Sequence, residues 1–366
     1  MASPMIRLEG VTKVYAGSAT PAVSGLSLDV GEGEIAVLVG PSGCGKTTTL
    51  KMINRLVEPT SGRIMVAGDD VMTVPAHELR RRIGYVIQQI GLFPHRTVAD
   101  NIATVPRLLG WDRPRIERRV DELVALVDLD PALRNRYPLE LSGGQRQRAG
   151  VARALAADPP VLLMDEPFGA VDPIVRSRLQ DELLGLQRRL RKTIVLVTHD
   201  VDEAIKVGDR VAILNVGGVL EQYAPPAEIL RQPAGRFVED FLGSDRGIKR
   251  LSLMPIRDVA LEPGPVVPRS ATRDEARAVM ARYGVDWFGI LDGEVLAGWA
   301  WGKELDDVPI ATLTPREFMV RLGHDDSLRE ALDTVITSHT RVAPVFDGKR
   351  FLGMLTVEAI SRELAR

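Results

Sequence analysis

The sequence holds a single cysteine, Cys44, among its 366 residues. One thiol excludes a disulfide within the chain and a cysteine-rich zinc site, and it is typical of proteins of a reducing cytosol. An excess of charge of one sign is also lacking, because 47 basic residues stand against 49 acidic ones, for a formal net charge of −2. This balance excludes a bulk basic surface of the kind that binds nucleic acid, so no nucleic-acid partner is expected.

Long hydrophobic runs are absent as well. The longest, at 35–39 and 161–164, fall far short of the roughly 20 residues that a membrane-spanning helix needs. The N-terminus has no apolar core after a basic start, so we expect no secretory signal. Any role at a membrane must therefore depend on a partner protein.

Residues 1 to about 243 alternate between short apolar runs and helical patterns. The runs at 34–39, 161–164 and 194–197 are rich in Val, Ile and Leu, which is typical of strands covered on both faces. Helical patterns follow at 46–56 and 200–207, hairpin-like segments lie at 63–66 and at Gly217-Gly218, and 98–136 is rich in helical patterns. This order predicts an α/β domain over 1–243, with a helical subdomain at about 89–150.

The rest of the chain contains an internal repeat with an offset of 55 residues. The matching positions are Glu275-Ala276 with Glu330-Ala331, Asp292-Gly293 with Asp347-Gly348, and Gly298 with Gly353. Each copy is predicted to run helix, strand, Asp-Gly turn, strand, helix. We therefore expect a linker at 244–253, a first repeat at 254–309 and a second at 310–366, together forming an α+β module.

The most specific chemical motif is a glycine-rich segment between a predicted strand and a predicted helix. Its residues are Gly40, Pro41, Ser42, Gly43, Cys44, Gly45, Lys46, Thr47 and Thr48. This context is that of a phosphate loop, in which glycines turn backbone N–H groups toward an anion and the helix N-terminus adds its positive end. We expect ATP here, with Lys46 bridging the β- and γ-phosphates and the Thr47 hydroxyl holding Mg²⁺.

Two carboxylates end the apolar run at 161–164. Asp165, at the strand tip, suits Mg²⁺, usually through water. Glu166, next to it, suits a general base that polarises the attacking water. Together with the phosphate loop, this pair predicts hydrolysis of ATP.

A second anion site is predicted 20 residues before Asp165, at Ser142, Gly143, Gly144 and Gln145, which we call the signature segment. A hydroxyl, free N–H groups and a helix N-terminus come together there. One protomer does not need two phosphate-gripping sites for one nucleotide. The segment makes sense if it caps a nucleotide bound to another subunit, which predicts a dimer.

The phosphate loop, the signature segment and the Asp-Glu strand, in this order, resemble the ATP-binding subunits of ABC transporters. The resemblance spans residues 1 to about 243 and implies further roles. Tyr15 is similar to the aromatic residue that stacks on adenine in this family. Gln88 is similar to the family's glutamine that touches Mg²⁺ and water and transmits the state of the site to the membrane subunit. Gln89 is the alternative candidate for that glutamine. Asp172 is similar to the dimer-loop aspartate, and His199 to the switch histidine that contacts the γ-phosphate.

The C-terminal repeat resembles a tandem CBS module, because Gly353-Met354-Leu355-Thr356 is similar to a segment of such domains. CBS domains that bind adenosine nucleotides commonly have an aspartate three residues after that threonine. Ala359 stands there instead, and the first repeat has Trp301 and Glu304 at the corresponding places. We therefore expect weak or no binding of plain adenosine nucleotides. For Trp287, Trp299 and Trp301 we expect packing between the repeats rather than an aromatic cage.

A cassette followed by CBS repeats resembles the ATPases of osmoregulatory importers of glycine betaine, carnitine, choline or proline betaine. The resemblance implies a homodimer on the cytoplasmic face of the membrane, bound to permease subunits that work with an external binding protein. An importer ATPase for an amino acid, oxyanion or sugar and an exporter ATPase remain alternatives. A DNA-repair or translation ATPase is a weaker one, because the chain has one cassette, one cysteine and no long heptad run.

Overall fold

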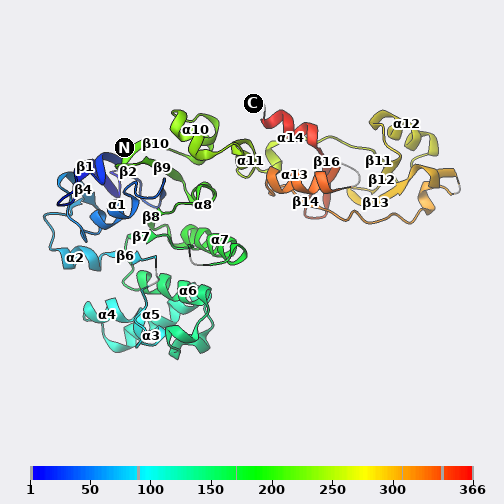
Figure 1. Ribbon diagram of the computed structural model, residues 1–366. Helices are drawn as coiled ribbons and strands as arrows, with labels where there is room; N and C mark the ends of the chain where they lie inside the picture. The colour runs from blue at the N-terminus through cyan, green and yellow to red at the C-terminus, as the bar shows by residue number, and fades with distance from the viewer. Residues whose placement is uncertain (1–2, 89–90, 170, 307, 339–341, 365–366) are drawn as a thin grey trace. The chain divides into compact units, whose positions relative to one another are not determined.

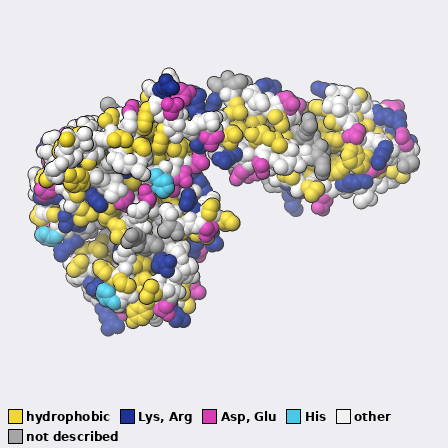
Figure 2. Space-filling model, viewed as in Figure 1, with side chains coloured by type: hydrophobic (Ala, Val, Ile, Leu, Met, Phe, Trp, Pro, Cys, Tyr) yellow, Lys and Arg dark blue, Asp and Glu magenta, His cyan; other side chains and the backbone are white. Residues whose placement is uncertain are grey.

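The computed structural model describes residues 3–88, 91–169, 171–306, 308–338 and 342–364. The chain divides into two compact units, Met1–Gly243 and Ser244–Arg366, each of which is described by itself (Figure 1). On the face that Figure 2 shows, basic and acidic side chains are mixed, as the near-neutral net charge predicts. Among the described residues, no helix is long and apolar enough to cross a membrane.

A six-stranded sheet in the order β10-β9-β3-β8-β7-β6 forms the centre of the first unit. Its strands are β3 (Ile35–Val39), β6 (Ile83–Val86), β7 (Val161–Asp165), β8 (Thr193–Val197), β9 (Arg210–Asn215) and β10 (Val219–Ala224). All neighbours run parallel except β9 and β10, which form a hairpin turned at Gly217-Gly218. The strands β3, β7 and β8 are buried at every residue, which confirms the expectation of strands covered on both faces.

An antiparallel sheet in the order β2-β1-β4-β5 packs its apolar side into the same core. Its strands are β1 (Ile6–Lys13), β2 (Val23–Val30), β4 (Ser61–Val66) and β5 (Asp69–Asp70). In β2 the buried residues Leu26, Leu28 and Val30 alternate with exposed ones, as is usual when one face of a sheet meets the core. The strand β2 begins directly after Ala22, which lies beside the phosphate loop.

Helices of the first unit follow the strands or fill the helical subdomain. They are α1 (Lys46–Ile53), α2 (Ala76–Arg81), α3 (Val98–Ile102), α4 (Thr104–Leu108), α5 (Arg113–Leu126), α6 (Gly143–Leu155), α7 (Pro173–Leu190), α8 (Val201–Val207), α9 (Pro226–Arg231) and α10 (Arg236–Leu242), with 3₁₀ turns at Pro131–Asn135 and Pro138–Glu140. Side-chain caps begin many of them, because the first N–H groups of a helix have no partner within it. In α5 the buried residues are Ile116, Val120, Leu123 and Val124, which confirms the apolar stripe read from the sequence.

The second unit repeats one motif twice with the predicted offset. The first copy contains β11 (Val266–Pro268), α12 (Arg273–Tyr283), β12 (Trp287–Asp292) and β13 (Val295–Trp301); the second contains β14 (Leu322–Gly323), α13 (Leu328–Thr337), β15 (Val342–Asp347), β16 (Arg350–Thr356) and α14 (Val357–Leu364). In each copy a short strand runs parallel to the first strand of a hairpin. Three 3₁₀ turns, Ile256–Asp258, Gly302–Asp306 and Ile310–Thr312, complete the unit.

Three local details repeat at the same offset of 55 residues. Thr272 and Ser327 both begin their helices with a capping box. The hairpin pairings of Gly298 and Gly353 are equivalent, and both glycines have φ of 150°, a conformation that L side chains rarely adopt. Their missing side chains let backbone pass close by, since a Cβ on Gly298 would lie 2.3 Å from the carbonyl oxygen of Arg316.

An aromatic cluster joins the two copies. Trp287 contacts Trp299 edge-on, with ring centroids 6.5 Å apart, and both belong to a cluster with Phe346 and Met354 of the second copy. The tryptophans therefore pack between the repeats. The segment 244–253, expected as a linker, instead holds α11 (Arg246–Leu251), because Leu251 is fully buried in the core of the second copy.

Candidate functional site

The phosphate loop connects β3 to α1, as its sequence predicts. Gly45, just before the helix, has φ of 90°, and a Cβ there would lie 2.3 Å from the carbonyl oxygen of Ala22, so a side chain is excluded. Lys46 is the first residue of α1 and is buried. Its Nζ donates to the carbonyl oxygens of Gly40 at 2.7 Å and Pro41 at 3.1 Å. The ammonium group is thus held by the carbonyl oxygens of the loop.

The carboxyl ends of three neighbouring strands, β3, β8 and β7, meet at one edge of the sheet. Asp165 ends β7, and its Oδ1 accepts a hydrogen bond of 2.9 Å from the Thr47 hydroxyl. Burial raises the pKa of Asp165, and the bond from Thr47 acts in the opposite direction. A carboxylate and a hydroxyl oxygen therefore lie together next to the phosphate loop, as hard oxygen ligands for Mg²⁺ would.

Glu166 lies between two other predicted residues. Gln88 donates from Nε2 to Oε2 of Glu166 at 2.7 Å, and Nδ1 of His199 lies 3.3 Å from Oε1. Glu166 itself has a left-handed backbone conformation with φ of 45°, which is uncommon outside glycine. Strained backbone of this kind concentrates at functional sites, where the surrounding structure maintains it.

One cavity of about 480 Å³ brings the phosphate loop together with Glu166 and His199. It is lined by Ala22, Ser42, Gly43, Cys44, Gly45, Lys46, Thr47, Thr48, Glu166 and His199. Tyr15 lies beside it, half-exposed, with its hydroxyl 3.5 Å from that of Thr48 and the Lys13 ammonium 5.3 Å from its ring centroid. Gln89 lies outside the described residues, so the contact with Glu166 is known for Gln88 alone.

The signature segment is not part of this cavity. It lines a second one of about 560 Å³, together with Asp172, Val175 and Arg178. Ser142 caps α6, accepting from the N–H of Gln145 at 3.3 Å, while the Gln145 side chain bonds back to the N–H of Ser142 at 2.8 Å. Asp172 caps α7 by accepting from the N–H groups of Ile174 and Val175. The phosphate loop and the signature segment thus line two separate cavities of the chain.

Sequence reasoning missed a buried polar group behind the cavity. Glu203 is 5% exposed in α8, and its Oε1 has no hydrogen-bond partner among the described residues. Burial, with the charge of Asp200 second, raises its pKa to about 7. Asp200 also accepts a hydrogen bond of 3.3 Å from Arg176 of α7. This bond links α7, the helix that Asp172 caps, to α8, the helix that follows His199. The sequence does contain a sign of this group: Glu203 comes three residues after Asp200, the cap of a helix that follows the buried strand β8.

A phosphate loop on a mostly parallel sheet, a carboxylate pair at the neighbouring strand end and a separate signature helix define an ATP-binding cassette. Comparison with protein families agrees: the model described as ABC transporter matches residues 23–169, and that of the CBS domain matches 312–366.

The relatives place the chain more narrowly. It is 46% identical to the osmoprotectant import ATP-binding protein OsmV of Salmonella typhimurium, over 99% of this chain and 96% of that protein. It is 45% identical to the glycine betaine/carnitine/choline transport ATP-binding protein OpuCA of Bacillus subtilis, over 97% and 94%. The chain belongs to this family of ABC transporter ATP-binding proteins.

Solved structures resemble the cassette. A dimeric bacterial ABC transporter cassette, MJ0796, aligns with a TM-score of 0.55 and 34% identity, covering 61% of this chain and 99% of that one. The same cassette in a post-hydrolysis state, bound to ADP and Pi, aligns with a TM-score of 0.54 and 33% identity, over the same shares of the two chains. The expected fold class is therefore confirmed.

Proposed function

We propose that this chain is the ATP-hydrolysing subunit of an importer of quaternary amines and related compatible solutes. The proposal that the chain hydrolyses ATP rests on one observation, which is that Lys46, Glu166 and His199 line the same cavity. The cargo is inferred from the relatives named for osmoprotectant and glycine betaine/carnitine/choline import, which match along nearly the whole chain.

Each group in the cavity has a task in this proposal. Lys46 exchanges its backbone carbonyl partners for phosphate oxygens, at little cost because its side chain is already ordered. Glu166 accepts a proton from the attacking water, and Gln88 and His199 orient its two oxygens. Tyr15 stacks on the adenine ring. The adjacent oxygens of Thr47 and Asp165 fit Mg²⁺, which would neutralise charge on the phosphates, and the Gln88 amide is its third candidate contact.

A homodimer completes the site. The signature segment lies in a cavity of its own with Asp172, so in a single protomer no residue from it lines the phosphate-loop cavity. A second protomer that brings its signature segment over the phosphate loop adds a hydroxyl and a helix N-terminus to the γ-phosphate. The dimeric cassette to which this chain is similar supports such an arrangement.

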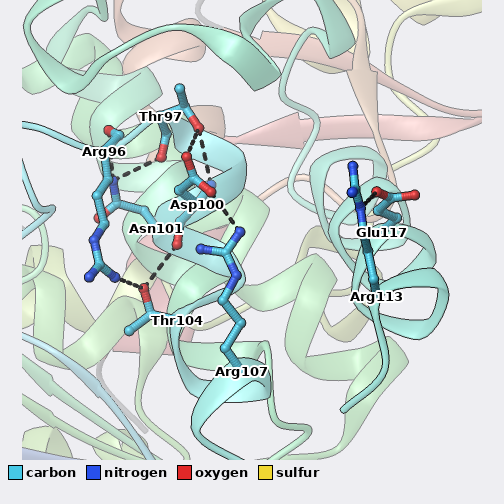
Figure 3. Close-up of polar contacts among 8 residues, drawn as sticks. All are labelled: Arg96, Thr97, Asp100, Asn101, Thr104, Arg107, Arg113 and Glu117. Carbon is cyan, nitrogen blue, oxygen red and sulfur yellow. Dashed lines mark hydrogen bonds and ion pairs between the residues drawn. The ribbon is translucent and has the colours of Figure 1, made fainter. Parts of the chain in front are cut away.

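A cleft in the helical subdomain supports a permease partner. It has a volume of about 620 Å³ and is lined by Thr97, Ala99, Asp100, Ala103, Arg107, Trp111, Arg113, Ile116, Glu117, Val120, Arg134 and Asn135. Its charged walls are already paired: Arg107 reaches Asp100 at 2.6 Å, and Arg113 reaches Glu117 at 2.8 Å (Figure 3). The cleft fits a short permease segment with an apolar side chain directed at Trp111, Ile116 and Val120.

The cleft is linked to the segment that follows Gln88. Asn101 of α3 is fully buried, and its amide bonds to the backbone of Phe93, Arg96 and Thr97. These bonds fasten the turn at 93–97 to the helix that forms one wall of the cleft. In this proposal, a displacement of the Gln88 segment on hydrolysis therefore reaches the permease through α3. The permease also holds the subunit peripherally at the cytoplasmic face of the membrane. An external binding protein delivers the solute to that permease.

The second unit regulates rather than catalyses in this proposal. Ala359 is buried and its N–H bonds to the Thr356 hydroxyl at 3.1 Å, while Glu304 is paired with Arg316 at 2.6 Å. The second repeat therefore has no carboxylate at this place, and the carboxylate of the first repeat is already ion-paired, so weak binding of plain adenosine nucleotides stays our expectation.

Uptake of labelled glycine betaine tests the proposal. A strain lacking the gene for this chain should lose uptake, wild-type protein should restore it, and Lys46→Ala should not. The Lys46→Ala protein should accumulate and melt like wild type, because its side chain is held by loop carbonyls and contributes little to the core. Uptake that persists in the deletion strain overturns the cargo, and wild-type ATP turnover in Lys46→Ala overturns the phosphate-loop assignment.

A further inference from the structure

Another cavity of the first unit, of about 540 Å³, lies between α6 and α7 and is used by none of the steps above. We call it the α6–α7 cavity. Most of its walls are apolar side chains, among them Leu126, Val151, Met164, Phe168, Leu179 and Leu183. This volume and this apolar lining are those of small-molecule sites. We propose that the cavity binds an apolar monocarboxylate of the medium-chain fatty acid type.

A buried amide without a partner shows where the polar end of such a ligand would lie. Gln147 lines the cavity and is 5% exposed, yet its Nε2 is buried with no hydrogen-bond partner among the described residues. An amide buried in apolar surroundings is costly unless it is hydrogen-bonded. In the proposed complex, the ligand carboxylate accepts from this N–H₂ group, which belongs to a side chain that lines the cavity.

Charges around the cavity favour an anion. Three cations, Arg148, Arg188 and Arg189, stand against two anions, Asp128 and Glu182. Both anions are already paired with Arg148, at 3.5 Å and 2.5 Å. Arg188 is exposed and has no ion-pair partner in the part of the chain that the structure describes. This surplus of positive charge around the cavity attracts a carboxylate and repels an ammonium group.

A glycine keeps the space open. Gly185 lies inside the 18-residue helix α7, where glycine is less favourable than alanine. It lines the cavity, and a Cβ built on it would meet no atom within 4 Å. A larger side chain at this position would thus enter the cavity instead of clashing with it. This makes Gly185 the natural place to block the site.

Calorimetric titration of the full chain with decanoate tests the proposal, with saturating ADP present so that the phosphate loop is occupied. We expect one decanoate per chain and at least ten-fold weaker binding of decylammonium. Gly185→Ala gains about as much helix propensity as Gly185→Leu but leaves most of the cavity open, so it should bind decanoate as wild type does. Gly185→Leu should weaken binding at least ten-fold while basal ATP turnover stays unchanged. Gln147→Leu should weaken decanoate several-fold and leave binding of decanol unaltered.

Four results would overturn the proposal: no decanoate binding by wild type, equal binding by Gly185→Leu, equal binding of decylammonium, or equal loss of decanol binding in Gln147→Leu. If Gly185→Leu does not fold, Val151→Phe fills the same cavity from α6 and takes its place. Circular dichroism melts of each variant establish which of the two is used.

Discussion

Gln88 and Glu166 lie 78 positions apart in the chain, and Nε2 of the first donates to Oε2 of the second at 2.7 Å. The contact joins the segment that enters the helical subdomain to the carboxylate proposed as the general base. Because His199 lies 3.3 Å from the other oxygen, the Glu166 side chain is held from both sides. The bond between Gln88 and Glu166 that orients the base can thus also couple the state of Glu166 to the cleft in the helical subdomain, through Asn101.

Replacement of the base tests this arrangement. Glu166→Gln retains the shape of the side chain and cannot accept the proton, so ATP turnover should fall by about 10²–10⁴-fold. Nucleotide binding should persist, and the variant should accumulate as an ATP-bound dimer in size-exclusion chromatography with Mg²⁺. Turnover within a few-fold of wild type, or a protein that stays monomeric with ATP, would contradict the assignment. Glu32→Gln, a change of the same kind outside the cavity, is the matched control.

A bulky cation in the signature segment should act across the dimer. Ser142→Arg should abolish hydrolysis while each subunit still binds ATP, because the signature cavity is separate from the phosphate-loop cavity of the same protomer. A mixed dimer of Ser142→Arg with Lys46→Ala distinguishes the arrangements. In the trans arrangement, one composite site combines the intact Lys46 of the first variant with the intact Ser142 of the second, and the other site carries both lesions. In a cis arrangement, each of the two sites would carry one lesion.

Photolabelling of that mixed dimer with an ATP analogue reads out the result. The trans arrangement predicts label on one subunit and hydrolysis from the site without lesions. The site without lesions is the one in which the intact phosphate loop of the Ser142→Arg subunit meets the intact signature segment of the Lys46→Ala subunit. A mixed dimer that is labelled but does not hydrolyse ATP would exclude the trans arrangement, because in a cis arrangement each site carries one lesion.

Glu203 should make the stability of the cassette depend on pH. Its pKa is raised from 4.5 to about 7, so between these values the unfolded chain releases a proton that the folded chain retains. The free energy of unfolding therefore falls as pH rises through this window, by about 3 kcal/mol in total. Glu203→Gln removes this loss.

Urea unfolding at pH 4 and pH 8 measures the effect. The stability of Glu203→Gln relative to wild type should increase by about 3 kcal/mol from the lower to the higher pH. Asp202→Asn, on the same helix and exposed, controls for the loss of one negative charge. A relative stability of Glu203→Gln that is the same at both pH values would show that Glu203 does not titrate in this way.

Truncation after Gly243 should leave a folded, active cassette. The first unit ends there and holds its own core and all of the proposed phosphate contacts. Basal ATP turnover of the fragment should lie within about two-fold of that of the full chain, measured at equal concentrations of folded protein. A loss of turnover in a fragment that still melts cooperatively would make the second unit part of the hydrolytic machinery.

The sequence alone was sufficient for features that depend on local pattern. The phosphate loop needs a glycine-rich turn between a strand and a helix, and both elements have a clear periodicity. The 55-residue repeat was likewise visible, because Gly298 and Gly353 occupy equivalent positions that only glycine fits well. The segment 244–253 was misread as a linker because its short helix is buried by packing partners far along the chain.

Relations between distant residues were decided by the tertiary structure. The order of strands in the sheet places Asp165, Glu166 and His199 beside the phosphate loop, and no local pattern determines that order. Burial likewise raises the pKa of Glu203 and leaves Nε2 of Gln147 without a hydrogen-bond partner among the described residues, because the cost of desolvation depends on what packs around a group. The sequence by itself determined which groups could do chemistry; packing decided which of them meet, and in what surroundings.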